Sequence, residues 1–166
     1  MKIELKPLEG IIVHGEKVAL GADIKTIPSI LGQADKIDNT YYYLESNIAV
    51  HTNDNSIEYI EFSFNDIFEV ILNGINVFTT KKVIILEELK RQNENKIKEE
   101  ENHHTYTFHD ISVNIGCEIT EKEAMEIINE AKAEGVYEDI QEEIENDIFM
   151  SKYISTIGLG VKDYCN

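Results

Sequence analysis

Short apolar runs separated by turn residues predict that the first third of the chain consists of strands around one short helix. The run Ile11-Ile-Val ends before Gly15, where we expect the chain to turn back. Asp23 is placed to cap a helical stretch, and Pro28, which a helix tolerates only in its first turn, limits that stretch to a few residues before Gly32. Its apolar residues share one helical face: Ile24, Ile27, Ile30 and Leu31.

Strands joined by tight turns follow this helix. Residues 41–51 have β-forming side chains on both sides of Ser46-Asn47, which predicts a hairpin. Residues 57–64 alternate in the way of a half-buried strand. The alternation defines two faces, with Ile57, Tyr59 and Glu61 on one and Ile60, Phe62 and Phe64 on the other. We expect the second set to face the core.

The same order of elements returns after residue 67, which predicts an internal repeat of residues 10–66 in residues 67–166. In this alignment Gly74 takes the place of Gly21, and Tyr106 precedes Ile111-Ser-Val113 by the five residues that separate Tyr43 from Ile48-Ala-Val50. A helix from Lys81 to about Lys96 and strands at 105–115 and 153–161 complete the second copy. The apolar stripe predicted for that helix contains Val83, Ile84, Leu86 and Leu89.

A helical segment, residues 118–149, interrupts the second copy. Thr120-Glu-Lys-Glu123 is a capping box, and Gly135 ends the helix that it starts. An apolar residue then recurs at every fourth position, which predicts a second helix packed on the body of the protein: Val136, Ile140, Ile144 and Ile148. The chain is therefore expected to be one compact α+β domain, residues 1–166, with two tandem helix-plus-antiparallel-sheet repeats and an acidic helical hairpin inserted in the second.

Composition and charge narrow the classes of function. Hydrophobic residues make up 42% of the 166 positions, enough for a real core. The formal net charge of −17 argues against nucleic acid as a partner, since phosphate binding needs clustered Lys and Arg. No apolar run is long enough for a membrane span, and the N-terminus lacks the apolar core of a signal peptide, so we expect a cytoplasmic protein that does not bind membranes.

The negative charge is concentrated in the helical insertion. Residues 118–147 contain twelve Asp and Glu against two Lys, which gives this segment a net charge of −10. Three interpretations remain open: a solvated helix face, a docking surface for a basic protein, and, least favoured, calcium binding. The acids lack the Asp-x-Asp-x-Asp-Gly loop that collects oxygens around calcium.

No catalytic signature of a hydrolase, kinase or dinucleotide-binding enzyme is present, so we expect a protein without enzymatic activity or cofactor. Gly158-Leu-Gly160 lacks the third glycine and the following helix of a dinucleotide fold, and is interpreted as a strand end or bulge. His103, His104 and His109 could meet a metal ion. No cysteine or carboxylate stands at the usual zinc spacing from them, however, and surface histidines are the favoured interpretation.

The remaining histidines and cysteines are interpreted as structural. His14 and His51 lie in predicted strands without a local nucleophile. Cys117 and Cys165 form no CxxC pair, which favours two reduced thiols over a disulfide.

Two groups of residues are candidates for contact with a partner. Tyr41, Tyr42 and Tyr43 form an aromatic run in a predicted strand, where at least one ring should reach solvent; packing between sheet and helix is the alternative. The second group consists of acids of the insertion: Glu130, Glu134, Glu138, Asp139, Glu142 and Glu145.

The stretch from Leu20 to Asp35, followed by Tyr-rich strands, resembles the helix-then-sheet unit of the β-lactamase-inhibitor-protein and outer-membrane small-lipoprotein group. In that group a glycine opens a short helical segment that ends in Leu-Gly before an antiparallel sheet, and the resemblance covers about 45 residues in each copy. The lipoprotein signal and its cysteine are absent, so an outer-membrane role is not expected.

The overall profile also resembles the immunity proteins of bacterial contact-dependent growth inhibition and polymorphic toxin systems. The resemblance implies an acidic protein that neutralises a basic toxin domain, often a nuclease, by covering its active site. The leading hypothesis is therefore an immunity protein. The alternative is a small-molecule-binding or scaffold module that uses a cleft between the two repeats.

Overall fold

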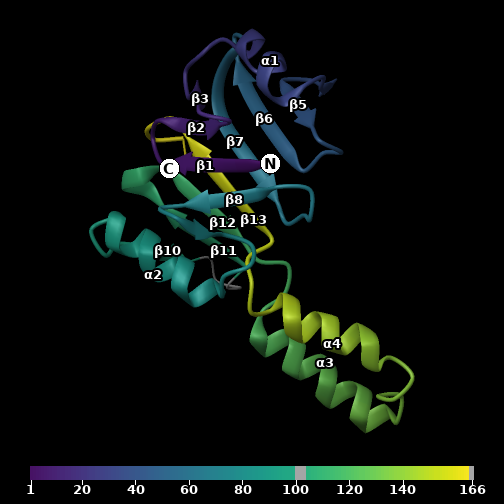
Figure 1. The fold of residues 1–166 in the computed structure, drawn as a ribbon. Helices are drawn as coiled ribbons and strands as arrows, with labels where there is room; N and C mark the ends of the chain where they lie inside the picture. Colours follow the sequence, from purple (N-terminus) through teal and green to yellow (C-terminus); the bar gives the residue numbers. More distant parts are fainter. Residues whose placement is uncertain (100–103, 165–166) are drawn as a thin grey trace.

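The computed structural model describes residues 1–99 and 104–164, which form an α+β fold of two β-sheets and several helices (Figure 1). The smaller sheet contains, in spatial order, β3 (Glu16–Ala19), β2 (Gly10–Val13), β1 (Lys2–Lys6), β8 (Glu69–Leu72) and β9 (Ile75–Asn76). The larger contains β10 (Lys98–Glu99), β11 (Thr105–Phe108), β12 (Val113–Gly116), β13 (Thr156–Gly160), β7 (Ser56–Ser63), β6 (Ile48–Asn53), β5 (Thr40–Tyr43) and β4 (Asp35–Ile37).

The helices belong to two different regions of the molecule. Near the sheets lie the 3-10 turns η1 (Ile24–Thr26) and η2 (His109–Ile111), the short α1 (Pro28–Leu31) and α2 (Lys82–Gln92). The helices α3 (Glu121–Glu134) and α4 (Gln141–Met150) form a hairpin that projects from the sheets (Figure 1). The α+β class predicted from the sequence is thus confirmed.

The main core lies between one face of the larger sheet and a layer formed by the smaller sheet, α1 and α2. Apolar side chains from both sheets, from α2 and from the residue before α1 are fully buried there, including Ile3, Ile27, Ile60, Ile85 and Ile157. As predicted, Asp23 caps the short helical stretch by accepting a hydrogen bond from the Lys25 amide, and Gly32 follows its end with a positive φ of 86°.

The order of elements in β2–β7 returns in β8–β13, with α3 and α4 inserted between β12 and β13. The two halves join through antiparallel pairing of β7 with β13, where Phe62 pairs with Ile157 and Ile60 with Leu159. When the two halves are exchanged, the Phe62–Ile157 pair takes the place of the Ile60–Leu159 pair. A local two-fold axis therefore passes through the Glu61–Gly158 pair, which lies between them. The boundary between the halves is therefore a continuous sheet and not an open cleft.

The structure corrects which glycines correspond in the two halves. His14 and Gly15, with φ of 52° and 85°, form the turn between β2 and β3. Asn73 and Gly74, with φ of 49° and 83°, form the same turn between β8 and β9. Gly74 thus corresponds to Gly15, and the predicted match with Gly21 was wrong. A two-residue hairpin turn needs positive φ at both central positions. This requirement identifies the corresponding glycines of the two halves better than the pattern of flanking apolar residues does.

The tyrosine correspondence between the halves is shifted for a similar reason. Tyr43 pairs with Ile48 across β5 and β6, and the equivalent pair across β11 and β12 is Phe108 with Val113. Tyr106 therefore corresponds to Tyr41, two residues away from the predicted match with Tyr43. Ile111, which was expected in a strand, lies in the turn η2.

Two predicted apolar faces were also wrong in part. Ile57 is fully buried because the pairing of β6 with β7 slips between His51 and Thr52, which changes the direction of the side chains beyond the slip. Phe64 follows the end of β7 and is 39% exposed. In α2 the consecutive apolar residues exceed the width of one face, so Ile85 and Leu89 are buried while Val83 and Ile84 are exposed.

The hairpin of α3 and α4 has a small core of its own. Ile128, Ala131 and Ile144 are buried between the two helices, with Ile140 and Ile148 among the partly buried residues around them. The predicted stripe of α4 therefore packs on α3, and the expectation that it packs on the body of the protein was wrong. Figure 1 shows the consequence: the hairpin extends away from the sheets.

Candidate functional site

The acids chosen from the sequence all lie on the exposed surface of the hairpin. Glu130 and Glu134 belong to α3, Glu138 and Asp139 to the connection between the helices, and Glu142 and Glu145 to α4. Glu145 accepts a hydrogen bond from Gln141. Among the described residues, no Lys, Arg or His forms an ion pair with any of the six. Their charge is therefore uncompensated by direct contacts within that part of the chain.

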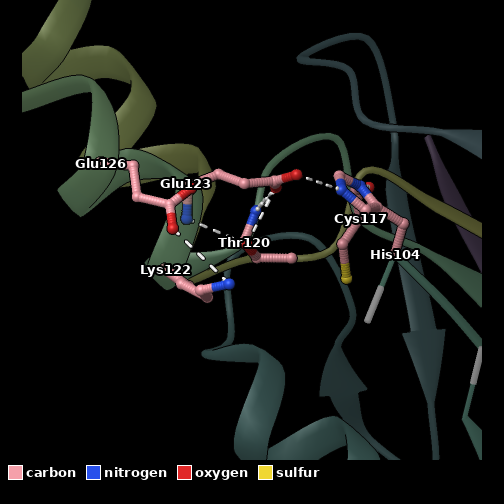
Figure 2. Close-up of polar contacts among 6 residues, drawn as sticks. All are labelled: His104, Cys117, Thr120, Lys122, Glu123 and Glu126. Carbon is pink, nitrogen blue, oxygen red and sulfur yellow. Dashed lines mark hydrogen bonds and ion pairs between the residues drawn. The ribbon is translucent and has the colours of Figure 1, made fainter. Parts of the chain in front are cut away.

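A complete capping box fixes the start of α3, as the sequence predicted. The Thr120 hydroxyl accepts a hydrogen bond from the Glu123 amide at 3.2 Å, and the Glu123 carboxylate accepts from the Thr120 amide at 2.9 Å (Figure 2). The Thr120 hydroxyl also donates to the same carboxylate. The Glu123 carboxylate thus accepts a hydrogen bond from the Thr120 amide, which would otherwise be unpaired at the start of the helix.

His104, which precedes β11, joins the body to this helix start. Its Nε2 lies 2.9 Å from Glu123 Oε1 and its Nδ1 lies 2.9 Å from the carbonyl oxygen of Cys117 (Figure 2). A carbonyl oxygen and a carboxylate only accept hydrogen bonds, so both ring nitrogens must donate. The arrangement therefore favours the doubly protonated, positively charged imidazolium.

The pKa values of the pair shift in agreement with this geometry. The hydrogen bond to Glu123, followed by that to the Cys117 carbonyl, raises the pKa of His104 above its usual value. The hydrogen bond from His104, followed by those from Thr120, lowers the pKa of Glu123 to about 2. The side chains are 26% and 41% exposed, so solvent screens the attraction and the contact is only moderately stabilising.

A groove of about 420 Å³ opens between α3 and α4 beside this pair. Three of its lining residues are apolar: Ile119, Ile127 and Met150. The others are His104, Asn146 and five acids: Glu118, Glu123, Glu126, Glu130 and Asp147. Of the acids selected from the sequence, only Glu130 lines this groove. The missed residues Glu123 and Ile127 left a signal in the sequence, because their spacing places them on the same helical face as Glu130.

The tyrosine run lies in a different part of the molecule. Tyr41 and Tyr42 are half-buried on β5, and the Lys36 ammonium lies 4.8 Å from the centre of the Tyr41 ring. Tyr43 is 1% exposed in the main core, so it does not contribute to a contact surface. Burial raises the pKa of its phenol to about 12. The structure does not bring the tyrosines and the acidic hairpin together (Figure 1).

The other candidate ligands have separate positions. His103 and Cys165 lie outside the described residues, Cys117 is a buried free thiol, and His109 belongs to the turn η2. Within residues 1–99 and 104–164, no three potential metal ligands come together. In the same residues, no helix has the length and apolar character that a membrane span requires.

Gly158 and Gly160 have a packing role in β13. A Cβ atom at Gly158 would overlap the hydroxyl of Tyr59, and one at Gly160 would collide with Tyr164. The rings of Tyr59 and Tyr164 are stacked with their centres 4.8 Å apart. The two glycines therefore make room for an aromatic pair. Gly158-Leu-Gly160 forms the end of β13, which confirms the predicted strand end.

The chain matches no protein-family model, no curated protein and no solved structure in the comparisons with known proteins. The fold and the site by themselves define it as an α+β protein with an acidic, projecting helical hairpin.

Proposed function

We propose that this chain is a non-enzymatic acidic binding protein, and specifically an immunity protein that neutralises a basic bacterial toxin domain, possibly a nuclease. The observation that carries the proposal is the separation of charge from the main core. The segment with a net charge of −10 is a projecting hairpin whose buried residues pack mainly on each other. An element that contributes little to the main core but holds most of the net negative charge is suited to contact with a basic surface.

The hairpin supplies both steering and contact in this proposal. Its field accelerates the encounter with a positively charged domain, because complementary charge raises association rates at low salt. Its projecting shape allows it to enter a concave surface such as the active site of a nuclease. Tyr41 and Tyr42 lie on the other half of the larger sheet and could add aromatic contact only to a partner that extends over both regions.

The test uses the protein encoded by the gene next to that of this chain. That protein is expressed alone and together with this chain, and growth and binding kinetics are measured. We expect this chain to restore growth, and we expect the association rate to fall steeply as salt is added. Failure to bind or to restore growth contradicts the proposal.

Charge reversal then locates the contact surface. Glu138, Glu142 and Glu145 are changed together to Lys, which should weaken binding at least tenfold through slower association and faster dissociation. The control reverses three exposed acids of the body, Glu16, Glu69 and Glu87, which changes the net charge by the same amount. Equal weakening by both sets would show that only net charge matters and that the hairpin is a solvated face.

A further inference from the structure

We propose that the groove between α3 and α4 binds a lysine or arginine side chain of a protein partner. This inference rests on the proposed function, in which the partner is basic, and adds the place where one of its cationic side chains is held. The groove is lined by the apolar residues Ile119, Ile127 and Met150 and by five carboxylates.

The two kinds of lining residue, apolar and acidic, match the two parts of a long basic side chain. Lys and Arg have an aliphatic stem that gains from contact with apolar surface and a charged end group that needs acceptors. In the groove Ile127 and Met150 supply the apolar surface, and Glu126, Glu130 and Asp147 supply the acceptors. A short polar cation would leave the apolar lining residues in contact with water, and an apolar side chain would leave the carboxylates unpaired.

The charge in the groove is not balanced from within the described chain. Of the five carboxylates, Glu123 is bound by His104 and Thr120, and Glu126 lies 3.5 Å from the largely exposed ammonium of Lys122. Glu118, Glu130 and Asp147 form no ion pair among the described residues. The positive charge of His104 offsets Glu123, so an excess of negative charge remains for a partner.

Asp147 adds an independent reason to expect a cation. It lies in the last turn of α4, where the helix dipole is negative, and that turn contains no basic residue. The carboxylate therefore adds to the negative potential at this end of the helix. A cationic end group in the groove would relieve this repulsion as well as pair with the carboxylate.

The three methionines of the chain allow a direct test of occupancy. Met150 lines the groove. Met125 lies on the same hairpin but outside the groove, and is 55% exposed. Met1 precedes β1 of the smaller sheet, far from the hairpin (Figure 1). The full chain is labelled at the methionine methyl groups and titrated with a hexa-arginine peptide in an NMR experiment. We expect the Met150 methyl resonance to shift in a saturable way while the Met125 resonance moves little. Equal movement of both would overturn the proposal, since it would indicate diffuse attraction to the hairpin.

Paired substitutions provide the matched control. Glu126→Gln with Glu130→Gln should weaken peptide binding at least fivefold, whereas Glu121→Gln with Glu143→Gln, two exposed hairpin acids outside the groove, should change it less than twofold although the change in charge is the same. Unchanged amide resonances along α3 would show that each variant keeps its fold. Equal losses in the two pairs would contradict the proposal. A titration with free 1,4-diaminobutane gives a second check. If the diamine shifted the Met150 resonance as much as the peptide does, a small diamine would be the better ligand and the proposal would be wrong.

The outcomes separate this inference from the proposed function. If the neighbouring gene product binds through the hairpin but neither the Met150 resonance nor the Glu126 and Glu130 pair responds, the immunity function stands and the groove is not a binding site. If the groove responds to the peptide but the gene product does not bind, the groove recognises cationic side chains and the immunity function is wrong.

Discussion

His104 Nε2 lies 2.9 Å from Glu123 Oε1, and this contact joins the body of the protein to the first turn of the projecting hairpin. The imidazole comes from the segment before β11, while the carboxylate belongs to α3 and also completes its capping box. One carboxylate thus starts the helix and anchors it.

The contribution of this contact to stability should depend on pH in a defined direction. The pKa of His104 is raised from 6.5, so its contribution is complete below that value and is lost as the pH rises through the raised pKa. The pKa of Glu123 is lowered from 4.5 to about 2, so its contribution is complete above 4.5 and is lost as the pH falls toward about 2. The contact is therefore strongest between these two ordinary values.

A His104→Gln variant measures the effect. Because the pair is partly exposed, we expect the variant to be less stable than the original protein by about 1 kcal/mol near pH 5.5 and by clearly less near pH 9, as measured by denaturant unfolding. Amide exchange should locate the loss in α3. A difference that does not change with pH would show that the imidazole acts only through packing.

The hairpin should be dispensable for folding of the body. Gly116 of β12 pairs directly with Thr156 of β13, so a tight turn can connect the two strands in place of residues 119–153. We expect a variant with Asn-Gly at this position to keep the sheets and a cooperative thermal transition, as followed by circular dichroism. Binding to the basic partner should be lost.

The internal core of the hairpin supplies the complementary change. Ile144 is 1% exposed between α3 and α4, and Ile144→Ala should destabilise the hairpin by about 2–4 kcal/mol through the cavity it creates. Amide exchange should accelerate in α3 and α4 and remain slow in β7. Acceleration throughout the molecule would show that hairpin and body unfold as one unit.

Gly158→Ala should destabilise the larger sheet. The added methyl group would overlap the Tyr59 hydroxyl at the centre of the sheet, and we expect a loss of about 1–3 kcal/mol in the free energy of unfolding. Combining it with Tyr59→Ala should recover part of that loss, because the ring no longer occupies the space. Additive effects in this double-mutant cycle would contradict the packing role of Gly158.

Tyr43→Phe should be neutral or stabilising. The Tyr43 hydroxyl is buried and has no hydrogen-bond partner among the described residues, and a buried polar group without a partner costs free energy. We expect a gain of up to about 1 kcal/mol, measured by denaturant unfolding, and no change for Tyr41→Phe, since Tyr41 is half-buried. A clear loss on Tyr43→Phe would show that the hydroxyl binds a group such as a buried water.

Local signals in the sequence predicted the elements that depend on neighbouring residues. The Thr120–Glu123 capping box, the cap at Asp23 and the turn at Gly15 all act within a few residues, so their chemistry can be read from the order of side chains. The repeated order of elements was also predictable, because each copy repeats the same alternation of strand and helix signals. The correspondence within the repeat was not, since matching apolar letters did not reveal which glycine occupies the hairpin turn.

The sequence by itself determined the α+β class, the concentration of negative charge in residues 118–147 and the helical character of that segment. Only the tertiary structure decided where the apolar stripe of α4 packs, because periodicity identifies a buried face but not the surface that buries it. In the same way, the whole of β11 and β12 lies between His104 and Glu123 in the chain, and their contact exists only because the sheet returns the chain to the start of α3. The groove with its acidic lining follows from that folding and could not have been derived from the charge pattern alone.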